Sequence, residues 1–335
     1  MLIDYKEEYQ KKRVLITGGL GFIGSNLAIS LVELGAEVQL VDAMIPEYGG
    51  NLFNIEAIRN KVSINFCNIT DINAINYLVK DVDYIFHLAG QGSHSVSIVD
   101  PFLDIECNMM ATLNVLEACK KNNRNAKIIF TGTRGQYKPK ISLPAKEDSD
   151  MTPNTIYGVT NLAAEKLLLI YHNLFGLKSV MTRISNVYGP RAQMRNNKYG
   201  VPNWFLRLAI DDQEIPIYGS GKIKRDFLFV EDLIDALLML PLKEECFGEV
   251  FNLGVPEPSN YLDYANLAIQ HSNSGRIRMV PFPKESEDQE AGDYYPDISK
   301  AKQFLGWEPK VSLAEGIEKT IAYYKKYRTN YWNHQ

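Results

Sequence analysis

The sequence has no long hydrophobic run, no excess of basic residues and few cysteines. Its 335 residues carry a net charge of −4, and we expect no nucleic-acid partner, because nucleic-acid-binding proteins usually present a basic surface. A membrane-spanning helix needs about 20 consecutive apolar residues, and the sequence offers no such run, so we expect no membrane segment. The opening residues, MLIDYKEEYQKK, are charged and have no signal-peptide core.

The cysteines are too scattered to form a recognisable cross-link or metal site. The four are Cys67, Cys107, Cys119 and Cys246, with no CxxC pair among them. We therefore predict reduced, mostly structural thiols, no metal site and a cytoplasmic location.

Strand-like and helix-like segments alternate through the first half of the chain. RVLIT (13–17) precedes a glycine-rich turn and a helical pattern that closes at Gly35. Further apolar runs of strand length follow, with helical stretches such as 101–122 between them: 62–69, 82–90, 126–133 and 178–185. Strands that alternate with helices predict an α/β fold of Rossmann type, with a doubly wound parallel sheet covered on both faces.

The second half is less regular and predicts a smaller domain inserted at the carboxyl edge of the sheet. After about Asn186 the chain becomes richer in proline, glycine and charge. The predicted elements are a helix at 201–212, sheet-like segments at 225–240 and 248–254, and two tail elements at 297–307 and 313–327. We predict a doubly wound domain over residues 12–185 and 226–254, and a discontinuous domain over 186–225 and 255–330.

A dinucleotide-binding turn is predicted where the first strand meets the first helix. Gly18 permits the tight turn, Gly21 lets the backbone approach a pyrophosphate, and Gly24 allows close helix–strand packing. Asp42 ends the next strand, where a carboxylate accepts hydrogen bonds from the adenosine ribose. Because that carboxylate repels a 2′-phosphate, the pattern favours NAD over NADP.

With those residues placed, the chain resembles the extended short-chain dehydrogenase/reductases of the nucleotide-sugar epimerase and dehydratase family. The resemblance extends from about Lys12 to Tyr327 and rests on TGGLGFIG, HLAG, YGVTNLAAEK, RISNVYGPR, YGSGKIKRDFLFVEDL and LGWEP in that order. It implies an NAD-binding first domain and a nucleotide-sugar-binding second domain. The implied NAD contacts, besides the three glycines and Asp42, are Phe22, Ile23, Asn68, Ile69, Leu88, Ala89, Gly90, Gln91, Tyr157 and Asn161. His87 is predicted to be a packed strand residue without an acid–base role.

The resemblance also implies the catalytic residues. Thr133 would hydrogen-bond the sugar hydroxyl that is oxidised, and Tyr157 would remove its proton while C4 delivers hydride to the nicotinamide. A phenol has a pKa of about 10 and needs a nearby positive charge to act as a base at neutral pH. The family keeps a lysine four residues after this tyrosine, and this chain has Asn161. Lys166 lies about half a turn out of phase on a helix and is predicted to face away.

Three interpretations of Asn161 remain open. The chain is a working enzyme in which the cofactor lowers the pKa of Tyr157, a variant altered to trap a complex, or a binding protein that has lost its chemistry. Asn161 shares a helix face with Tyr157 at i, i+4, so it can contact the nicotinamide ribose but supplies no charge.

The residues after Thr133 limit which of the family's reactions the sequence favours. Dehydratases of the family usually carry an Asp-Glu pair there, and decarboxylating members a glutamate, whereas this chain has Arg134 and Gly135. Without a group to protonate a departing hydroxyl, the sequence favours C4 epimerisation or another C4 oxidation or reduction. A 4,6-dehydratase with its acid elsewhere is the alternative.

The resemblance places the nucleotide sugar in the second domain. The predicted substrate contacts are Ser93, His94, Arg134, Asn186, Arg191, Tyr218 and Arg225. For Arg134, contact with an anionic or hydroxyl-rich sugar and a salt bridge at the cleft rim are both open. Glu290 stands where the family commonly has an arginine. Family members are commonly dimers, and segments 101–121 and 155–174 would form the contact in a homodimer here.

Overall fold

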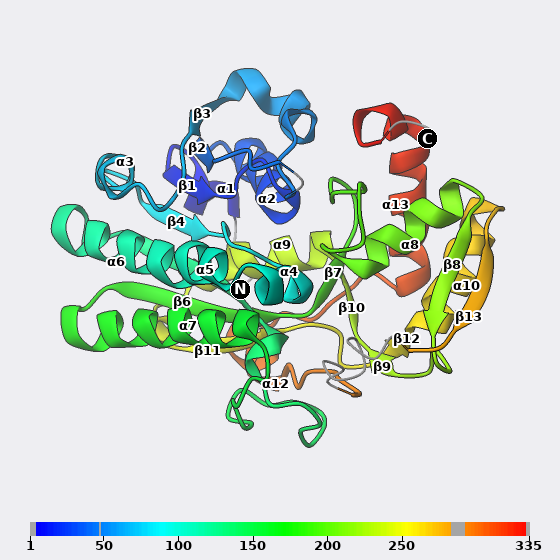
Figure 1. The fold of residues 1–335 in the computed structure, drawn as a ribbon. Coiled ribbons are helices and arrows are strands. Elements are labelled where there is room, and N and C mark those ends of the chain that lie inside the picture. The colour runs from blue at the N-terminus through cyan, green and yellow to red at the C-terminus, as the bar shows by residue number, and fades with distance from the viewer. Residues whose placement is uncertain (1–4, 47, 283–291, 333–335) are drawn as a thin grey trace.

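The structure, a computed structural model, describes residues 5–46, 48–282 and 292–332. Its main sheet runs in the order β11-β6-β5-β4-β1-β2-β3, and every neighbouring pair is parallel. Its strands are β1 (Arg13–Thr17), β2 (Glu37–Asp42), β3 (Val62–Phe66), β4 (Tyr84–His87), β5 (Lys127–Thr133), β6 (Lys178–Ile184) and β11 (Val250–Leu253). The predicted Rossmann-type parallel sheet is therefore confirmed (Figure 1).

Each face of the sheet has its own hydrophobic layer. Along β1, Val14 and Ile16 join one layer and Leu15 joins the other, because successive strand residues point to opposite faces. The first layer also takes residues from α1 (Tyr5–Tyr9), α2 (Phe22–Glu33) and α9 (Val230–Met239). The second takes residues from α3 (Ile72–Leu78), α6 (Ala111–Asn122) and α7 (Ile156–Phe175), of which α6 and α7 lie side by side in Figure 1.

The helical stretch predicted at 101–122 forms with one irregularity. It begins as α5 (Pro101–Asp104), continues as the π-helix η2 (Ile105–Met110) and ends as α6. Three shorter elements each follow a strand of the main sheet in the chain: η1 (Leu52–Lys61) after β2, α4 (His94–Val99) after β4 and η3 (Arg134–Gln136) after β5. Among the described residues, no helix is both long and apolar enough to cross a membrane.

The elements outside the main sheet and its covering helices form a smaller group, called the second unit below. It has a separate core of aromatic and aliphatic side chains. Its helices are α8 (Val201–Ile210), α10 (Tyr261–Ser272) and α13 (Leu313–Tyr327). They pack beside β8 (Glu214–Tyr218), which pairs in parallel with β13 (Arg276–Val280). The remaining elements are β7 (Asn186–Tyr188), β9 (Lys224–Arg225), β10 (Phe227–Phe229), β12 (Ser259–Asn260), α12 (Ser299–Leu305) and the 3-10 turns η4 (Leu240–Leu242), η5 (Glu244–Cys246) and η6 (Arg328–Asn330).

The prediction of a sheet-like segment at 225–240 is mostly wrong. Only β9 and β10 are strands there, and Val230–Met239 is the helix α9. Most of α9 is buried, including Leu233, Ile234 and Leu237. A buried helix of this kind is apolar on several sides, so its sequence resembles the continuous apolar run of a buried strand.

One buried ion pair ties three elements of the site together. Arg183 on β6 donates to both carboxylate oxygens of Glu165 on α7, at 2.8 Å each, and each of the two side chains is 1% exposed. Gln136 of η3 donates to the same carboxylate at 2.7 Å, while its carbonyl oxygen accepts from the Thr133 backbone N–H at 2.9 Å. The pair therefore fixes the segment that carries Thr133.

Arg183→Met is expected to lower the free energy of unfolding by about 3–5 kcal/mol, because it leaves the Glu165 carboxylate buried without its main partner. Chemical denaturation measures this change. The double variant Arg183→Met/Glu165→Leu is the control and is expected to recover most of the loss, since an apolar pair replaces the ions. A single variant as stable as the native chain would contradict the assigned role.

Candidate active site

Two cavities contain most of the predicted site residues, and the first of them lies at the carboxyl ends of β1, β2 and β4. It has a volume of about 340 Å³. The predicted cofactor residues that line it are Gly18, Gly21, Phe22, Ile23, Gly24, Asp42, Asn68, Ile69, Leu88, Ala89 and Gly90. In open α/β sheets, ligands bind at this edge, so the structure brings most of the predicted cofactor contacts to one place.

The glycines make a cradle that side chains would fill. Gly18 has a φ of +69°, a conformation that favours glycine. A Cβ atom on Gly24 would lie 2.2 Å from the Gly18 carbonyl oxygen. This close approach sets the start of α2 against the turn, so the N–H groups at the helix N-terminus can face a pyrophosphate.

Asp42 and Asn68 stand on the wall of the same cavity. The Asp42 carboxylate accepts hydrogen bonds from Leu20 N at 3.1 Å and Met44 N at 2.9 Å, and burial raises its pKa above the usual value. Asn68 Oδ1 accepts from Thr70 N at 3.0 Å, and a second lone pair is left for an adenine amino group. The donor and acceptor set fits the adenosine end of NAD.

Gln91 does not line the cavity. Its amide donates to Asp104 Oδ2 at 2.8 Å, and Asn108 donates to the other oxygen of Asp104 at 3.3 Å. Asn108 also donates to Thr160 at 3.2 Å, one turn from the predicted catalytic tyrosine. Asp104 is fully buried, and burial raises its pKa to about 6. This network was not predicted, although an aspartate on the buried side of an apolar helix was a signal for it.

His87 occupies the structural place predicted for it. Its ring nitrogens lie 2.9 Å from Thr17 Oγ1 and 3.1 Å from Thr112 Oγ1. Burial lowers its pKa to about 4, so the ring is neutral at physiological pH.

Thr133 and Tyr157 come together from neighbouring elements. Thr133 is the last residue of β5, and Tyr157 lies in the first turn of α7, which Thr155 caps by accepting from Gly158 N at 3.1 Å. Burial raises the pKa of Tyr157 above 10.0, with a further contribution from Asp104, while Thr133 and the positive charge of Arg134 act in the opposite direction.

Asn161 adds no charge to this pair. Its side-chain amide donates to the Tyr157 backbone carbonyl at 2.9 Å, as the i, i+4 spacing predicts, and the residue is 6% exposed. Lys166 lies on the exposed side of α7 with its ammonium group 3.5 Å from the Glu165 carboxylate. It faces away from the phenol, as predicted, and cannot replace the family's lysine.

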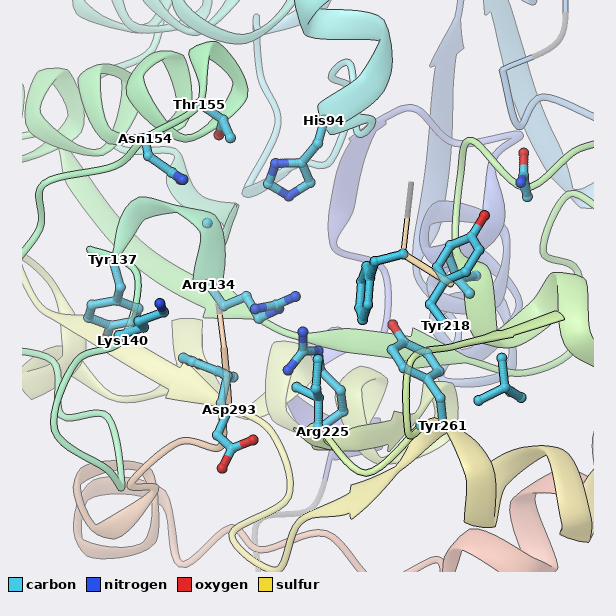
Figure 2. A pocket seen from close by; sticks show the side chains of 18 of the residues that line it. His94, Arg134, Tyr137, Lys140, Asn154, Thr155, Tyr218, Arg225, Tyr261 and Asp293 are labelled. Atoms are coloured by element: carbon cyan, nitrogen blue, oxygen red, sulfur yellow. The ribbon is translucent and has the colours of Figure 1, made fainter. Parts of the chain in front are cut away.

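The second cavity, of about 330 Å³, lies between the sheet and the second unit. The predicted substrate residues that line it are His94, Arg134, Tyr218 and Arg225. Figure 2 shows the Arg134 and Arg225 side chains meeting near its centre, with His94 on one side and Tyr218 on the other. The His94 ring packs edge-on against Tyr157 at 4.7 Å between centroids. One residue of the cavity lining is therefore in contact with the predicted base.

Three predicted substrate residues do not line either of the two cavities. Ser93 is buried and caps α4. Asn186 donates to the Asp226 backbone carbonyl at 3.1 Å. Arg191 donates to Asn54 O at 3.2 Å and to Asn26 Oδ1 at 2.9 Å, which turns its guanidinium toward structural contacts. Their placement does not favour the predicted roles, and Glu290 lies outside the described residues.

Several residues that line the second cavity were not predicted from the sequence. They are Tyr137, Lys138, Lys140, Asn154, Trp204, Phe205, Tyr261, Phe282, Asp293 and Tyr294. They come from six separate parts of the chain. Tyr218 and Phe282, with ring centroids 5.5 Å apart, form the apolar end that a nucleoside base would need.

The sequence and the fold match known proteins along almost the whole chain. The family profile described as GDP-mannose 4,6 dehydratase matches residues 15–320. A UDP-N-acetyl-alpha-D-glucosaminuronate decarboxylase of Bacillus cytotoxicus is 33% identical over 330 residues, 94% of this chain and 98% of that protein. The UDP-glucose 4-epimerase of Thermotoga maritima, solved with UDP-glucose, superposes with a TM-score of 0.86 at 30% identity, covering 94% of this chain and 99% of that one.

A further structure matches this chain and contains the cofactor. It is an enzyme of Bordetella bronchiseptica in complex with NAD+, with a TM-score of 0.81 and 26% identity over 96% of this chain and 95% of that one. Fold and site thus define an extended short-chain dehydrogenase/reductase. The chain belongs to the GDP-mannose 4,6-dehydratase family within that class, the nucleotide-sugar epimerases and dehydratases. The predicted resemblance is confirmed, but relatives of similar identity are named as decarboxylase, 4-epimerase and 4,6-dehydratase, so their names do not decide the reaction.

Proposed function

We propose that this chain is an NAD-dependent nucleoside-diphosphate-sugar C4 epimerase or C4 oxidoreductase. The observation that carries the proposal is the Thr133–Tyr157 pair, which lies at the same carboxyl edge of the sheet as the glycine cradle. Arg134 and Gly135 stand in place of the acidic residues that elimination needs. NAD is the cofactor that fits Asp42 and the cradle, and when bound it accepts hydride from the sugar carbon and returns it.

The side chains have separate tasks in this reaction. Thr133 orients the C4 hydroxyl, and Tyr157 takes its proton and later gives it back. Asn161 holds its amide beside the Tyr157 carbonyl and would contact the cofactor ribose. Arg225 faces the centre of the second cavity (Figure 2), where its guanidinium suits a diphosphate.

A 4,6-dehydratase remains the weaker alternative. Elimination needs a general acid and base beside C5 and C6. Among the described residues lining the second cavity, Asp293 is the single carboxylate, and its oxygen accepts from the Lys224 backbone N–H at 2.9 Å.

The experiment that tests the proposal is incubation of the NAD-loaded protein with a panel of UDP-, GDP-, dTDP- and CDP-sugars. The absorbance of bound NADH reports hydride transfer, and separation of the sugars identifies the product. A C4 epimer, or a 4-keto sugar that keeps its C6 oxygen, supports the proposal. A 4-keto-6-deoxy product would show a dehydratase instead.

A second candidate is a nucleotide-sugar-binding protein without turnover. The raised pKa of Tyr157 and the uncharged Asn161 favour it, because both reduce the phenolate available at neutral pH. It predicts saturable ligand binding without any NADH signal at any pH.

We also propose that the chain forms a homodimer through its α5–α6 segment and α7. The exposed apolar side chains on these helices and on α4 are Ile98, Val99, Phe102, Ile105, Met110, Ile156, Val159, Ile170, Leu174 and Phe175. A patch of this kind usually marks an interface. Sedimentation equilibrium is expected to give twice the chain mass, and Phe102→Asp is expected to give the single mass. A native monomer would contradict the interface.

A further inference from the structure

Arg134 is a charged side chain that lines the second cavity. It follows Thr133 directly, lies in η3 and packs over the Tyr294 ring at 5.2 Å. Its guanidinium makes no hydrogen bond or ion pair with any residue in the described ranges. The rim salt bridge considered from the sequence is therefore not present there, and five N–H donors are left for a ligand.

The neighbouring charges do not neutralise Arg134. Arg225 is close enough for its positive charge to lower the pKa of Arg134, in addition to the lowering by burial. The Asp226 carboxylate acts in the opposite direction on this pKa, but it accepts hydrogen bonds from Ser185 Oγ and Val255 N. The described lining also contains Lys138 and Lys140, against Asp293 alone. A guanidinium group held at a cavity wall without an ion-pair partner among the described residues, as Arg134 is, suits an anionic ligand group.

Position distinguishes the two arginines. Arg225 lies on β9 and Tyr218 ends β8, both in the second unit, and we assign these two residues to the nucleotide end of the cavity. Arg134 is adjacent in the chain to the residue that orients the C4 hydroxyl. In a hexose, C6 is attached to C5, the direct neighbour of C4, so a group on C6 lies next to the reacting centre.

We propose that the substrate is a nucleotide sugar with a carboxylate at C6, a uronic acid, and that Arg134 binds this carboxylate through its planar pair of N–H donors. This inference rests on the proposed function and names its substrate class. A bidentate guanidinium–carboxylate contact is directional, so it would also fix which face of C4 meets the cofactor. Neutral hexoses leave the Arg134 donors unpaired and bind less well.

Calorimetry on the NAD-loaded protein tests this assignment in two stages. UDP, dTDP, GDP and CDP are titrated first, and the one that binds best defines the nucleotide. Its glucose and glucuronate conjugates are then compared. The native chain is expected to prefer the glucuronate conjugate by about 10- to 100-fold, the range of a hydrogen bond to a charged group. Arg134→Met and Arg134→Gln are expected to remove this preference and leave affinity for the free nucleotide unchanged.

Controls separate this contact from a general effect of charge. Lys138 lines the same cavity but pairs with Asp150 at 3.4 Å, so Lys138→Met should keep the preference. An Arg134 variant that loses affinity for the free nucleotide would make Arg134 a diphosphate ligand and overturn the proposal. A native chain that binds both conjugates equally would also overturn it, while hydride transfer to a neutral sugar would leave the proposed function standing. Binding of no nucleotide would overturn both.

Discussion

At pH 7, Asn161→Lys is expected to reduce bound NAD with its sugar substrate about 10 to 1,000 times faster than the native chain. An ammonium group one helical turn from Tyr157 lowers the pKa of the phenol by about 1 to 3. The native pKa lies above 10.0 because of burial, so each decrease of one raises the phenolate fraction at neutral pH about tenfold. Stopped-flow absorbance of NADH measures the rate.

The pH profile provides the sharper test of this charge effect. The native rate is expected to rise with pH through the whole neutral range, because burial raises the pKa of the Tyr157 phenol above its usual value. The Asn161→Lys rate should level off at a lower pH. Asn161→Met is the matched control: it fills the same place without charge and should keep the native profile. A native rate that is already independent of pH near 7 would show that the cofactor alone lowers the pKa of Tyr157.

Tyr157→Phe is expected to slow hydride transfer by about 10²- to 10⁴-fold, since it removes the group that we propose takes the C4 proton. Sugar affinity should change little, because the ring and its packing against His94 remain. Single-turnover NADH absorbance gives the rate, and calorimetry gives the affinity.

Tyr171→Phe is the matched control for this change. Tyr171 lies on the same helix, and its hydroxyl donates to Glu117 away from the site. Its loss should leave the rate of hydride transfer unchanged. If Tyr157→Phe kept the native rate, another group would have to take the proton, and the proposed role of Tyr157 would fail.

The sequence was most informative where function constrains the backbone itself. Gly18 and Gly24 were recognisable because a Cβ atom at either position meets neighbouring backbone. Tyr157 and Asn161 could be related to each other because a helix fixes which residues share a face. The predicted fold class and family followed from such local patterns and are confirmed.

Side-chain direction was not available from the same patterns. Gln91 and Ser93 follow a cofactor-binding strand, yet both turn inward, Gln91 to Asp104 and Ser93 to the start of α4. Arg191 belongs to a motif that resembles a substrate loop, yet its guanidinium binds Asn26 and the Asn54 carbonyl. For Gln91 and Arg191 the partner lies in another segment of the chain, whereas Ser93 makes a local cap contact with Val96.

By itself, the sequence determined the parallel sheet and the dinucleotide turn, since each depends on residues within one or two turns or strands. Through its family resemblance it also predicted the catalytic pair and the missing lysine. Only the tertiary structure decided that Arg134 has no partner among the described residues and meets Arg225 in one cavity. It also decided that Asp104 lies buried near Tyr157 and raises its pKa. The reason is physical: a charge takes its effect from the groups that surround it in space, and these come from distant segments.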